Sequence, residues 1–486
     1  MRTRRADLYI YLSAAAAMAL VAPAGPLYWD SSGYVGQAIS GHVGGLGLGR
    51  PVFILVSHVL ARAWFAVGGS AAHLEPVLRL FWSAVSCTTA PLTWRLARRA
   101  SLTVRASAMA GLAVAVSPAM AHSGGAVLTD GPATAACVLA GMLSLEAVLE
   151  SWDARPALGR RALALGAAAG AVTGLAIGLR EQSLFSLGTL ALMLPIARRG
   201  DRWPLGLAMA GGVTVVVAAP MLLVWLTEPD YLGTIQTWLL GMARDRAAAT
   251  FGWRDAPLFA LWIAALGPVV AYAAVSAWGR RGPMWRAGGA LFAVAAPSLV
   301  ELGLAPVVRG ISYSPRFLLA ALPGAIAIPG AWAIDRWIGG SRLRFAAATV
   351  AIAFPLVVAA PLLRARSAPL LATFQALPSM LANVPPTAVI VTGQPCPAIA
   401  LQRAIIAHDS PSQAVPDWQA VCPGWAWPTD LAGRLDAASR DGRAIVLDLR
   451  PTSWIGVEQQ SAFAEVQSYA QAIAPRVDAR QVIVWR

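Results

Sequence analysis

The stretch "RRALALGAAAGAVTGLAIGLREQSLFSLGTLALMLPIARR", residues 160–199, holds two apolar segments between two pairs of arginines. Residues 162–179 and 183–197 carry no charge, and each is close to the length of a helix that crosses a bilayer. Only Arg180, Glu181 and Gln182 separate the two segments. The stretch therefore predicts two membrane helices joined by a short polar turn.

The composition extends this interpretation to the whole chain. Of the 486 residues, 57% are hydrophobic and 13% are charged, and the mean hydropathy is +0.60, which is too apolar for a single soluble domain. We therefore predict a polytopic α-helical membrane protein with about 11 transmembrane helices. The expected spans are residues 8–24, 77–94, 106–121, 128–148, 162–179, 183–197, 205–226, 258–278, 287–305, 317–334 and 345–363.

The basic residues indicate topology rather than nucleic-acid binding. The net charge is +14, but all 38 basic residues are arginines, and many of them cluster in every second loop between apolar segments. The positive-inside bias then places the N-terminus in the cytoplasm. We expect a multi-pass protein of a bacterial inner membrane. Its expected outer segments are residues 25–76, the short turn near His122, residues 180–182, 227–257 and 306–316, and the chain after about 366.

The last 120 residues have a different pattern. The runs "TAVIVTG" (387–393), "RAIVLDL" (443–449) and "QVIVWR" (481–486) are typical of buried strands. They predict a small extracytoplasmic α/β domain over residues 366–486, following a transmembrane domain over residues 1–365. Cys396 and Cys422 both lie in it, so an oxidising compartment would allow a disulfide that contributes roughly 3 to 4 kcal/mol, with two free thiols as the alternative.

The first outer segment begins with "YWDSSGYVGQAISG", residues 28–41. It places Asp30 between Trp29 and Tyr34 in a chain with few acids. Trp29 and Tyr34 suit either stacking on a sugar or anchoring at the membrane interface. No cofactor is indicated with certainty, although a divalent metal held by Asp30 with a nearby histidine stays open, the histidines being His42, His58, His73 and His122.

Several features in a fixed order resemble the GT-C superfamily of integral membrane glycosyltransferases. They are Asp30 after the first span, the segment "GRPVFILVSHVL" (49–60) leading into an interface helix, "LTDGPATAA" (128–136) with Asp130, and "YSPRFLLAALPGAIAI" (313–328). The similarity is to the branch of protein O-mannosyltransferases and aminoarabinose lipid A transferases. Many relatives have an acidic pair in the first loop, whereas Ser31 and Ser32 follow Asp30 here.

The resemblance implies that a hexosyl or pentosyl group passes from a polyprenyl-phosphate donor to an acceptor hydroxyl on the outer side of the membrane. The acceptor is a glycan, a lipid or a protein, and the bilayer is the other partner. Carried over by position, the two acids are Asp30 and Asp130, and the late tyrosine and arginine are Tyr313 and Arg316.

The chemistry of such a transfer agrees with the outer residues. A glycosyl phosphate has a good leaving group, so the reaction needs one base and cations that hold the phosphate. Asp30 is the candidate base, and Arg180, Arg309 and Arg316 are candidates for the phosphate because a guanidinium binds it through two hydrogen bonds. We group Tyr313 with these arginines, Asp130 with Asp30 as catalytic, and Trp29, Tyr34 and Glu181 as substrate-binding.

Each of these residues also has a structural interpretation. Asp30 could be a solvated loop acid or a helix cap, and Asp130 could cap the fourth span. Arg180 and Glu181 could pair with each other. Two other classes of function stay open as well, namely a transporter or lipid-linked sugar flippase and a non-catalytic assembly protein.

Overall fold

The computed structural model describes residues 2–21, 29–44, 49–153, 159–228, 230–231, 233–234, 236, 283–304, 316–392, 396–422, 431–448 and 482–485. The expected span at 258–278 lies outside these residues, as do residues 457–474, where the sequence has a helix-like pattern. The contacts divide the chain into two compact units. The helical unit is Met1–Ala22, Val43–Val56 and Arg79–Pro361, and the mixed unit is Pro23–His42, Ser57–Leu78 and Leu362–Arg486.

Described helices coincide with ten of the eleven predicted spans. Among the described residues, eleven helices lie within the helical unit, and α3, α4 and α17 contribute to both units. Their bounds are α1 Arg2–Val21, α3 Pro51–Ala66, α4 Leu74–Cys87, α5 Thr89–Arg99, α6 Val104–Ala115, α7 Pro118–Gly124, α8 Asp130–Asp153, α9 Arg160–Leu179, α10 Ser186–Met193, α11 Arg202–Thr227, α14 Pro283–Leu304, α15 Arg316–Ala321, α16 Ile328–Ile338 and α17 Arg342–Leu381.

Every expected span that falls in the described part of the chain coincides with helical structure. The expected second span is divided between α4 and α5, and the third between α6 and α7, which meet at a bend of 49°. The bend has a local cause, because Ser117 caps α7 by accepting a hydrogen bond from Met120 N at 3.0 Å and Pro118 opens that helix.

By length and apolar composition, four described helices can each cross a membrane, and the bent pair α6 and α7 would be a fifth. The four are Asp130–Trp152, Arg160–Leu179, Arg199–Thr227 and Arg342–Ala365. These helices, together with the C-terminal sheet, confirm a multi-span helical membrane protein with a small α/β domain. The number of eleven spans stays a prediction.

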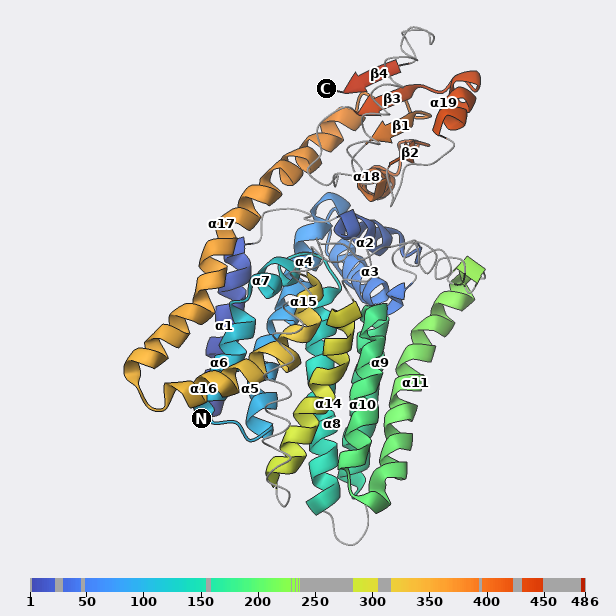
Figure 1. Ribbon diagram of the computed structural model, residues 1–486. Coiled ribbons are helices and arrows are strands. Elements are labelled where there is room, and N and C mark those ends of the chain that lie inside the picture. Colours follow the sequence, from blue (N-terminus) through green and yellow to red (C-terminus); the bar gives the residue numbers. More distant parts are fainter. Residues whose placement is uncertain are drawn as a thin grey trace. The chain divides into compact units, whose positions relative to one another are not determined.

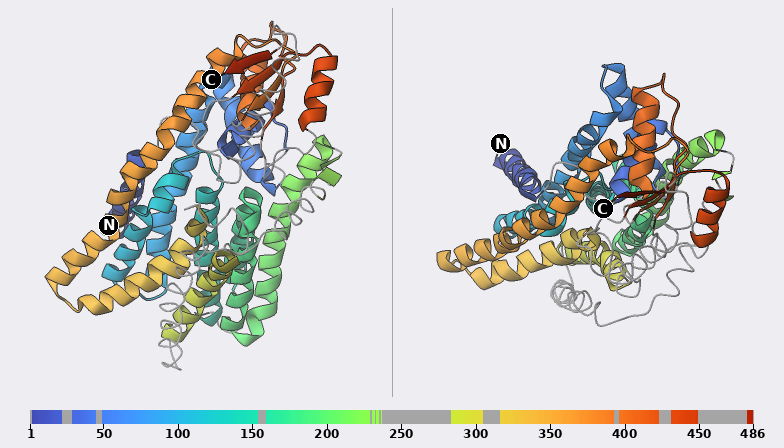
Figure 2. Two further views of the ribbon diagram at one scale, coloured as in Figure 1. Left: turned by 45° about the horizontal axis from the view of Figure 1, so that its top comes forward. Right: turned by 90° about the horizontal axis from the view of Figure 1, so that it is seen from above.

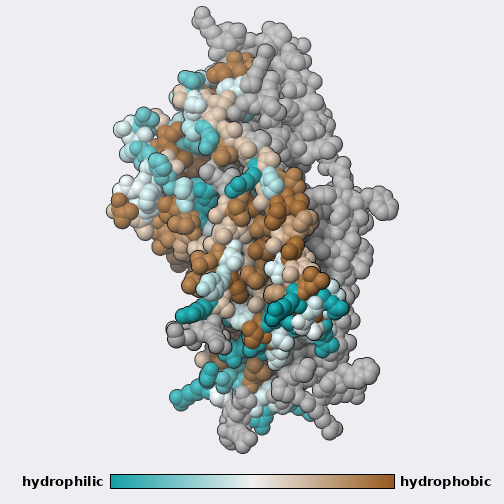
Figure 3. Space-filling view, turned by 90° about the vertical axis from the view of Figure 1, so that its left-hand side faces the viewer, coloured by the Kyte–Doolittle hydropathy of each residue, from teal (hydrophilic) through white to brown (hydrophobic). Residues whose placement is uncertain are grey.

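The outer surface of the helical unit is apolar where it would contact lipid. Figure 3 shows a wide area of apolar side chains (brown) with hydrophilic ones (teal) along its lower margin. On the N-terminal helix α1 and the first half of α17, large apolar side chains are exposed, including Leu8, Tyr9, Leu12, Leu343, Val350, Phe354 and Val357. Because soluble proteins rarely expose so many neighbouring apolar side chains, this surface suits a bilayer.

Glycines allow the central helices of this unit to approach closely. Helix α9 packs against both α8 and α11, which run beside it in Figure 1. A Cβ atom at Gly170 would lie 1.9 Å from the carbonyl oxygen of Met209, and one at Gly212 would lie 2.2 Å from that of Ala167. The backbones of α9 and α11 are therefore in direct contact, as small residues permit in membrane helices.

The mixed unit contains a parallel sheet of four strands in the order β2-β1-β3-β4. The strands are β1 Val389–Thr392, β2 Gln419–Val421, β3 Ile445–Asp448 and β4 Val482–Trp485, with Val389 opposite both Gln419 and Ile445. The three expected strands are present, and β2 is an addition. Every residue of the central strands β1 and β3 is buried, because helices cover both faces of a parallel sheet.

Two small cores flank this sheet. One face packs Ile390 and Val446 against α18 (Cys396–Asp409) and the end of α17, and the other packs Val391 and Leu447 against α19 (Leu431–Arg440). In both views of Figure 2, α19 (red) stands beside the sheet. The unit also includes α2 (Trp29–Ser40), the 3-10 turn η2 (Ala71–His73) and the adjoining ends of α3 and α4. The first outer segment therefore folds with the C-terminal residues, whereas the predicted domain boundary at 365 separates them.

Candidate functional site

The helical unit brings Asp130 and Arg180 together. Asp130 is the first residue of α8, and Arg180 follows the last residue of α9. Nη2 of Arg180 lies 3.3 Å from Oδ1 of Asp130, and each side chain is 4% exposed. Arg180 also donates a hydrogen bond to the side chain of Gln182. A carboxylate and a guanidinium are thus held together between the ends of two membrane helices.

The neighbouring Glu181 forms an ion pair with a different arginine, Arg50. It begins the 3-10 helix η3 (Glu181–Phe185) and accepts two hydrogen bonds from Arg50, from Nε at 3.0 Å and from Nη2 at 3.2 Å. The backbone explains the separation, since Arg180 is extended, with φ of −157° and ψ of 118°. Successive side chains of an extended backbone point to opposite sides, so Arg180 and Glu181 leave the backbone in different directions.

Arg50 is a residue that the sequence analysis did not select. It directly precedes Pro51, the first residue of α3, and its side chain is 9% exposed. Proline is favoured at the first position of a helix because that position needs no N–H donor. The sequence signal for Arg50 was the Arg-Pro pair, because the proline marks the first residue of the helix and so places the arginine directly before it.

The four side chains carry no net charge, and Arg50, Asp130 and Arg180 are buried whereas Glu181 is half-buried. Burial alone would raise the pKa of Glu181, but the charge and hydrogen bonds of Arg50 and the charge of Arg180 outweigh it and hold the pKa below its ordinary value. Taking a single charge of this set out of water would be costly, so each one depends on its partner.

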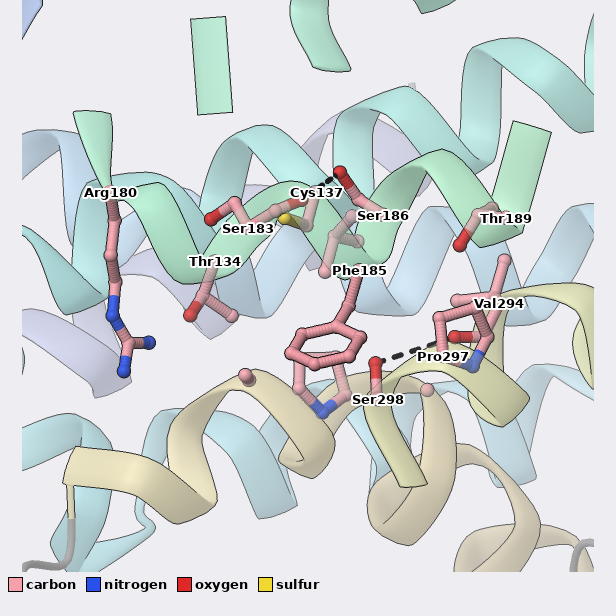
Figure 4. A pocket seen from close by; sticks show the side chains of 14 residues that line it. Thr134, Cys137, Arg180, Ser183, Phe185, Ser186, Thr189, Val294, Pro297 and Ser298 are labelled. Atoms are coloured by element: carbon pink, nitrogen blue, oxygen red, sulfur yellow. Dashed lines mark hydrogen bonds between the residues drawn. The ribbon is translucent and has the colours of Figure 1, made fainter. Parts of the chain in front are cut away.

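A small cavity with a mixed polar and apolar lining adjoins Arg180. Its volume is about 30 Å³, which is room for one or two water molecules and too little for a sugar. Figure 4 shows Thr134 and Ser183 between Arg180 and the ring of Phe185, with Pro297 and Ser298 of α14 on the far side. Other hydroxyl groups line it, from Ser186 and Thr189. The hydroxyl groups near Arg180 therefore lie among apolar side chains such as Phe185 and Val294.

Asp30 lies in the mixed unit, in the first turn of α2. It is 2% exposed, so the solvated loop acid considered above is not what the structure shows. Ser31 and Ser32, which follow it, are fully buried, and neither hydroxyl has a hydrogen-bond partner among the described residues. Tyr34 is also fully buried. The segment is therefore packed within the protein rather than spread over its surface.

The remaining predicted residues are placed only in part. Arg309 and Tyr313 lie outside the described residues, as do the side chains of Trp29 and Arg316. Cys396 and Cys422 form a disulfide with their Cα atoms 5.6 Å apart. Among the described residues, no three histidine, cysteine, aspartate or glutamate side chains are grouped so that they could hold a metal ion.

The fold, with its multi-span helices and a C-terminal α/β sheet, is shared with solved membrane glycosyltransferases. ArnT from Cupriavidus metallidurans in the apo state matches with a TM-score of 0.55 and 15% identity, over 97% of this chain and 94% of that one. The chain has the GT-C fold. At this identity the match establishes the fold alone, and no family model and no curated protein matches the sequence.

An archaeal enzyme gives a second match of the same quality. The apo oligosaccharyltransferase of Archaeoglobus fulgidus has a TM-score of 0.55 and 14% identity, over 82% of this chain. The same enzyme, AglB, in complex with an inhibitory peptide and a dolichol-phosphate has a TM-score of 0.54 and 14% identity, over 85% of this chain. The chain spans 64% of the length of the archaeal chain in both structures.

Proposed function

We propose that the protein is a glycosyltransferase that moves a hexosyl or pentosyl group from a polyprenyl-phosphate donor to an acceptor hydroxyl on the outer side of the membrane. The observation that carries the proposal is the buried pair of Asp130 and Arg180, with Arg50 and Glu181 beside it, in a chain with the GT-C fold. A lipid phosphate is the expected donor because AglB, of the same fold, was solved with dolichol-phosphate.

In the proposed reaction, Asp30 takes the proton of the acceptor hydroxyl while the acceptor oxygen attacks the anomeric carbon of the sugar. The bond from that carbon to the phosphate oxygen breaks, and the polyprenyl phosphate leaves as an anion. Arg180, whose side chain the structure describes, binds this phosphate. Arg309, Arg316 and Tyr313 are proposed to bind it as well. Asp130 orients the guanidinium of Arg180, as Glu181 orients that of Arg50.

The three residues expected to bind substrate, Trp29, Tyr34 and Glu181, are now given different roles. Glu181 holds Arg50 through two hydrogen bonds, so we assign it to orienting that arginine rather than to a sugar hydroxyl. Tyr34 is fully buried and supports the fold of the segment after Asp30. Trp29 keeps the proposed role of a sugar platform.

Turnover by the purified protein tests the proposal. The protein in lipid nanodiscs is incubated with radiolabelled polyprenyl-phosphate sugars and a panel of glycolipid, polysaccharide and protein acceptors, and transferred label is counted. Asp30→Asn keeps the shape of the side chain and removes its basicity, so we expect transfer to fall about 10²- to 10⁴-fold with folding unchanged. Arg180→Lys keeps the charge but loses the paired donors, and should also fall sharply.

The control is Arg161→Gln, because Arg161 is 74% exposed where it pairs with Glu150. It should transfer sugar at the wild-type rate. Near wild-type transfer by folded Asp30→Asn would remove Asp30 as the base. Release of intact donor across a sealed vesicle without any transfer would show a flippase instead.

A further inference from the structure

Helix α18 of the C-terminal residues packs directly on α2, the helix that bears Asp30. The contact is made at two glycines of α2. A Cβ atom at Gly33 would lie 3.5 Å from Cβ of Pro397, and one at Gly36 would lie 3.6 Å from Cα of Leu401 and 3.8 Å from its nitrogen. The two helices therefore meet with almost no side chain between their backbones at this point, and a residue larger than alanine at position 36 has no room.

The other end of α18 contacts η2, which directly precedes α4. Oδ1 of Asp409 accepts a hydrogen bond from Ala71 N at 2.8 Å, and Oδ2 accepts one from Ala72 N at 3.1 Å. These are the first N–H groups of η2, and the local N-cap residue, Ser70, makes no side-chain capping bond. Asp409 thus caps η2, although it lies 338 positions away in the sequence. The local sequence does not provide this cap.

Two further contacts fix α18 itself. The ring of His408 packs on that of Phe65 near the end of α3, with ring centroids 3.7 Å apart, and Nδ1 of His408 lies 3.0 Å from Oδ1 of Asp409. At its start, Cys396 is bonded to Cys422, just after β2. One helix therefore contacts α2, the end of α3 and the start of η2, and it is tied to the sheet.

From these contacts we infer that α18 positions the outer segment that carries Asp30, and that Gly36 and Asp409 are positioning residues for the transfer. The inference rests on the proposed function for its activity readout. Asp30 is buried and needs a fixed backbone to present its carboxylate, because a displacement of about 1 Å at a reacting group can cost about 10²-fold in rate. The C-terminal α/β domain then acts as a brace for the catalytic segment.

Position 36 gives a matched pair of variants. In Gly36→Ala the new methyl group makes an ordinary contact with Leu401 and favours the helix, so turnover and folding should match the wild type. In Gly36→Leu the side chain must push α2 away from α18. We expect kcat to fall about 10- to 100-fold with the donor KM unchanged, and hydrogen exchange of peptides from residues 29–42 to become faster in the full-length protein.

Asp409 tests the second contact. Asp409→Ala removes both acceptors, so exchange at residues 71–75 should become faster and kcat should fall. Asp409→Glu keeps a carboxylate and should restore part of both. The control is Asp436→Ala, because Asp436 is an exposed carboxylate on α19 in the same domain, and this variant should change neither measurement. Mass mapping without reduction checks that the bond between Cys396 and Cys422 is intact in every variant.

The outcomes separate the two proposals. If the wild type transfers no sugar, the proposed function fails, and the exchange data still test the brace. If Gly36→Leu and Asp409→Ala lower only the yield of folded protein and leave kcat per folded molecule unchanged, α18 is structural and the inference is overturned. Unchanged exchange at residues 29–42 in Gly36→Leu would overturn it as well.

Discussion

At the scale of single residues, the charges at the ends of α8 and α9 take part in two ion pairs. Asp130 faces Arg180, and Glu181 faces Arg50, although Arg180 and Glu181 are neighbours in the chain. The extended backbone at Arg180 decides this, because it sends the two side chains to opposite sides. The sequence selected three of these four residues, and the pairing of Arg50 depended on a contact across 131 positions.

Glu181→Gln tests the pair with Arg50 through its pH dependence. The pKa of Glu181 is held below its ordinary 4.5, so the charged form stabilises the fold above pH 4.5 and this stabilisation is lost as pH falls through the lowered pKa. At pH 7 the variant leaves a buried guanidinium without its carboxylate and should lose about 3 kcal/mol. Thermal unfolding in detergent from pH 7 to pH 3 should show this difference shrinking below pH 4.5.

Glu150→Gln is the comparison for that experiment, since the pair of Arg161 and Glu150 is far more exposed. It should cost less than about 1 kcal/mol at any pH. A difference between Glu181→Gln and the wild type that stays constant down to pH 3 would contradict the pairing.

At the scale of elements, glycine decides how closely the membrane helices pack. Gly170 of α9 faces the backbone of α11, whereas Gly211 of α11 has no atom within 4 Å of where a Cβ would lie. Spans that are rich in Ala and Gly permit close helix packing in general. Which glycine faces a neighbouring helix was not predictable, because it depends on the rotation of each helix about its own axis.

Gly170→Ala and Gly211→Ala form a test of this packing. The methyl group at position 170 would lie 1.9 Å from the oxygen of Met209, so the two helices must separate, at a cost of about 1 to 3 kcal/mol or more. The methyl group at position 211 meets nothing, and alanine favours the helix. Scanning fluorimetry of the purified protein should show a lower Tm for Gly170→Ala alone. Equal melting of the two variants would show that α9 and α11 are not in backbone contact there.

Some strands of the sheet were likewise predictable from the sequence and one was not. The runs at 389–392, 445–448 and 482–485 were predictable because a buried parallel strand is a short β-branched run. Strand β2 is only three residues long and includes exposed Gln419, so no periodicity marks it. Its pairing with β1 defines it, and pairing is a property of the folded chain.

At the scale of the whole molecule, the arginine clusters predict which side of the membrane each loop occupies. Reporter fusions after residues 100, 200 and 380 test this directly. Cytoplasmic signal is expected at 100 and 200, and extracytoplasmic signal at 380, because Arg clusters are retained inside. An outside signal at 100 or 200, or an inside signal at 380, would overturn the topology and with it the outer location proposed for Asp30.

The sequence by itself determined what depends on neighbours along the chain. Apolar runs between arginines are enough to predict membrane helices, and β-branched runs are enough to predict strands, because burial in lipid or in a sheet constrains each segment separately. Tertiary structure alone decided which segments meet. Asp409 caps η2 across 338 positions, and residues 23–42 fold with the chain after Leu362. Such contacts depend on the path of the whole backbone, which no local pattern specifies.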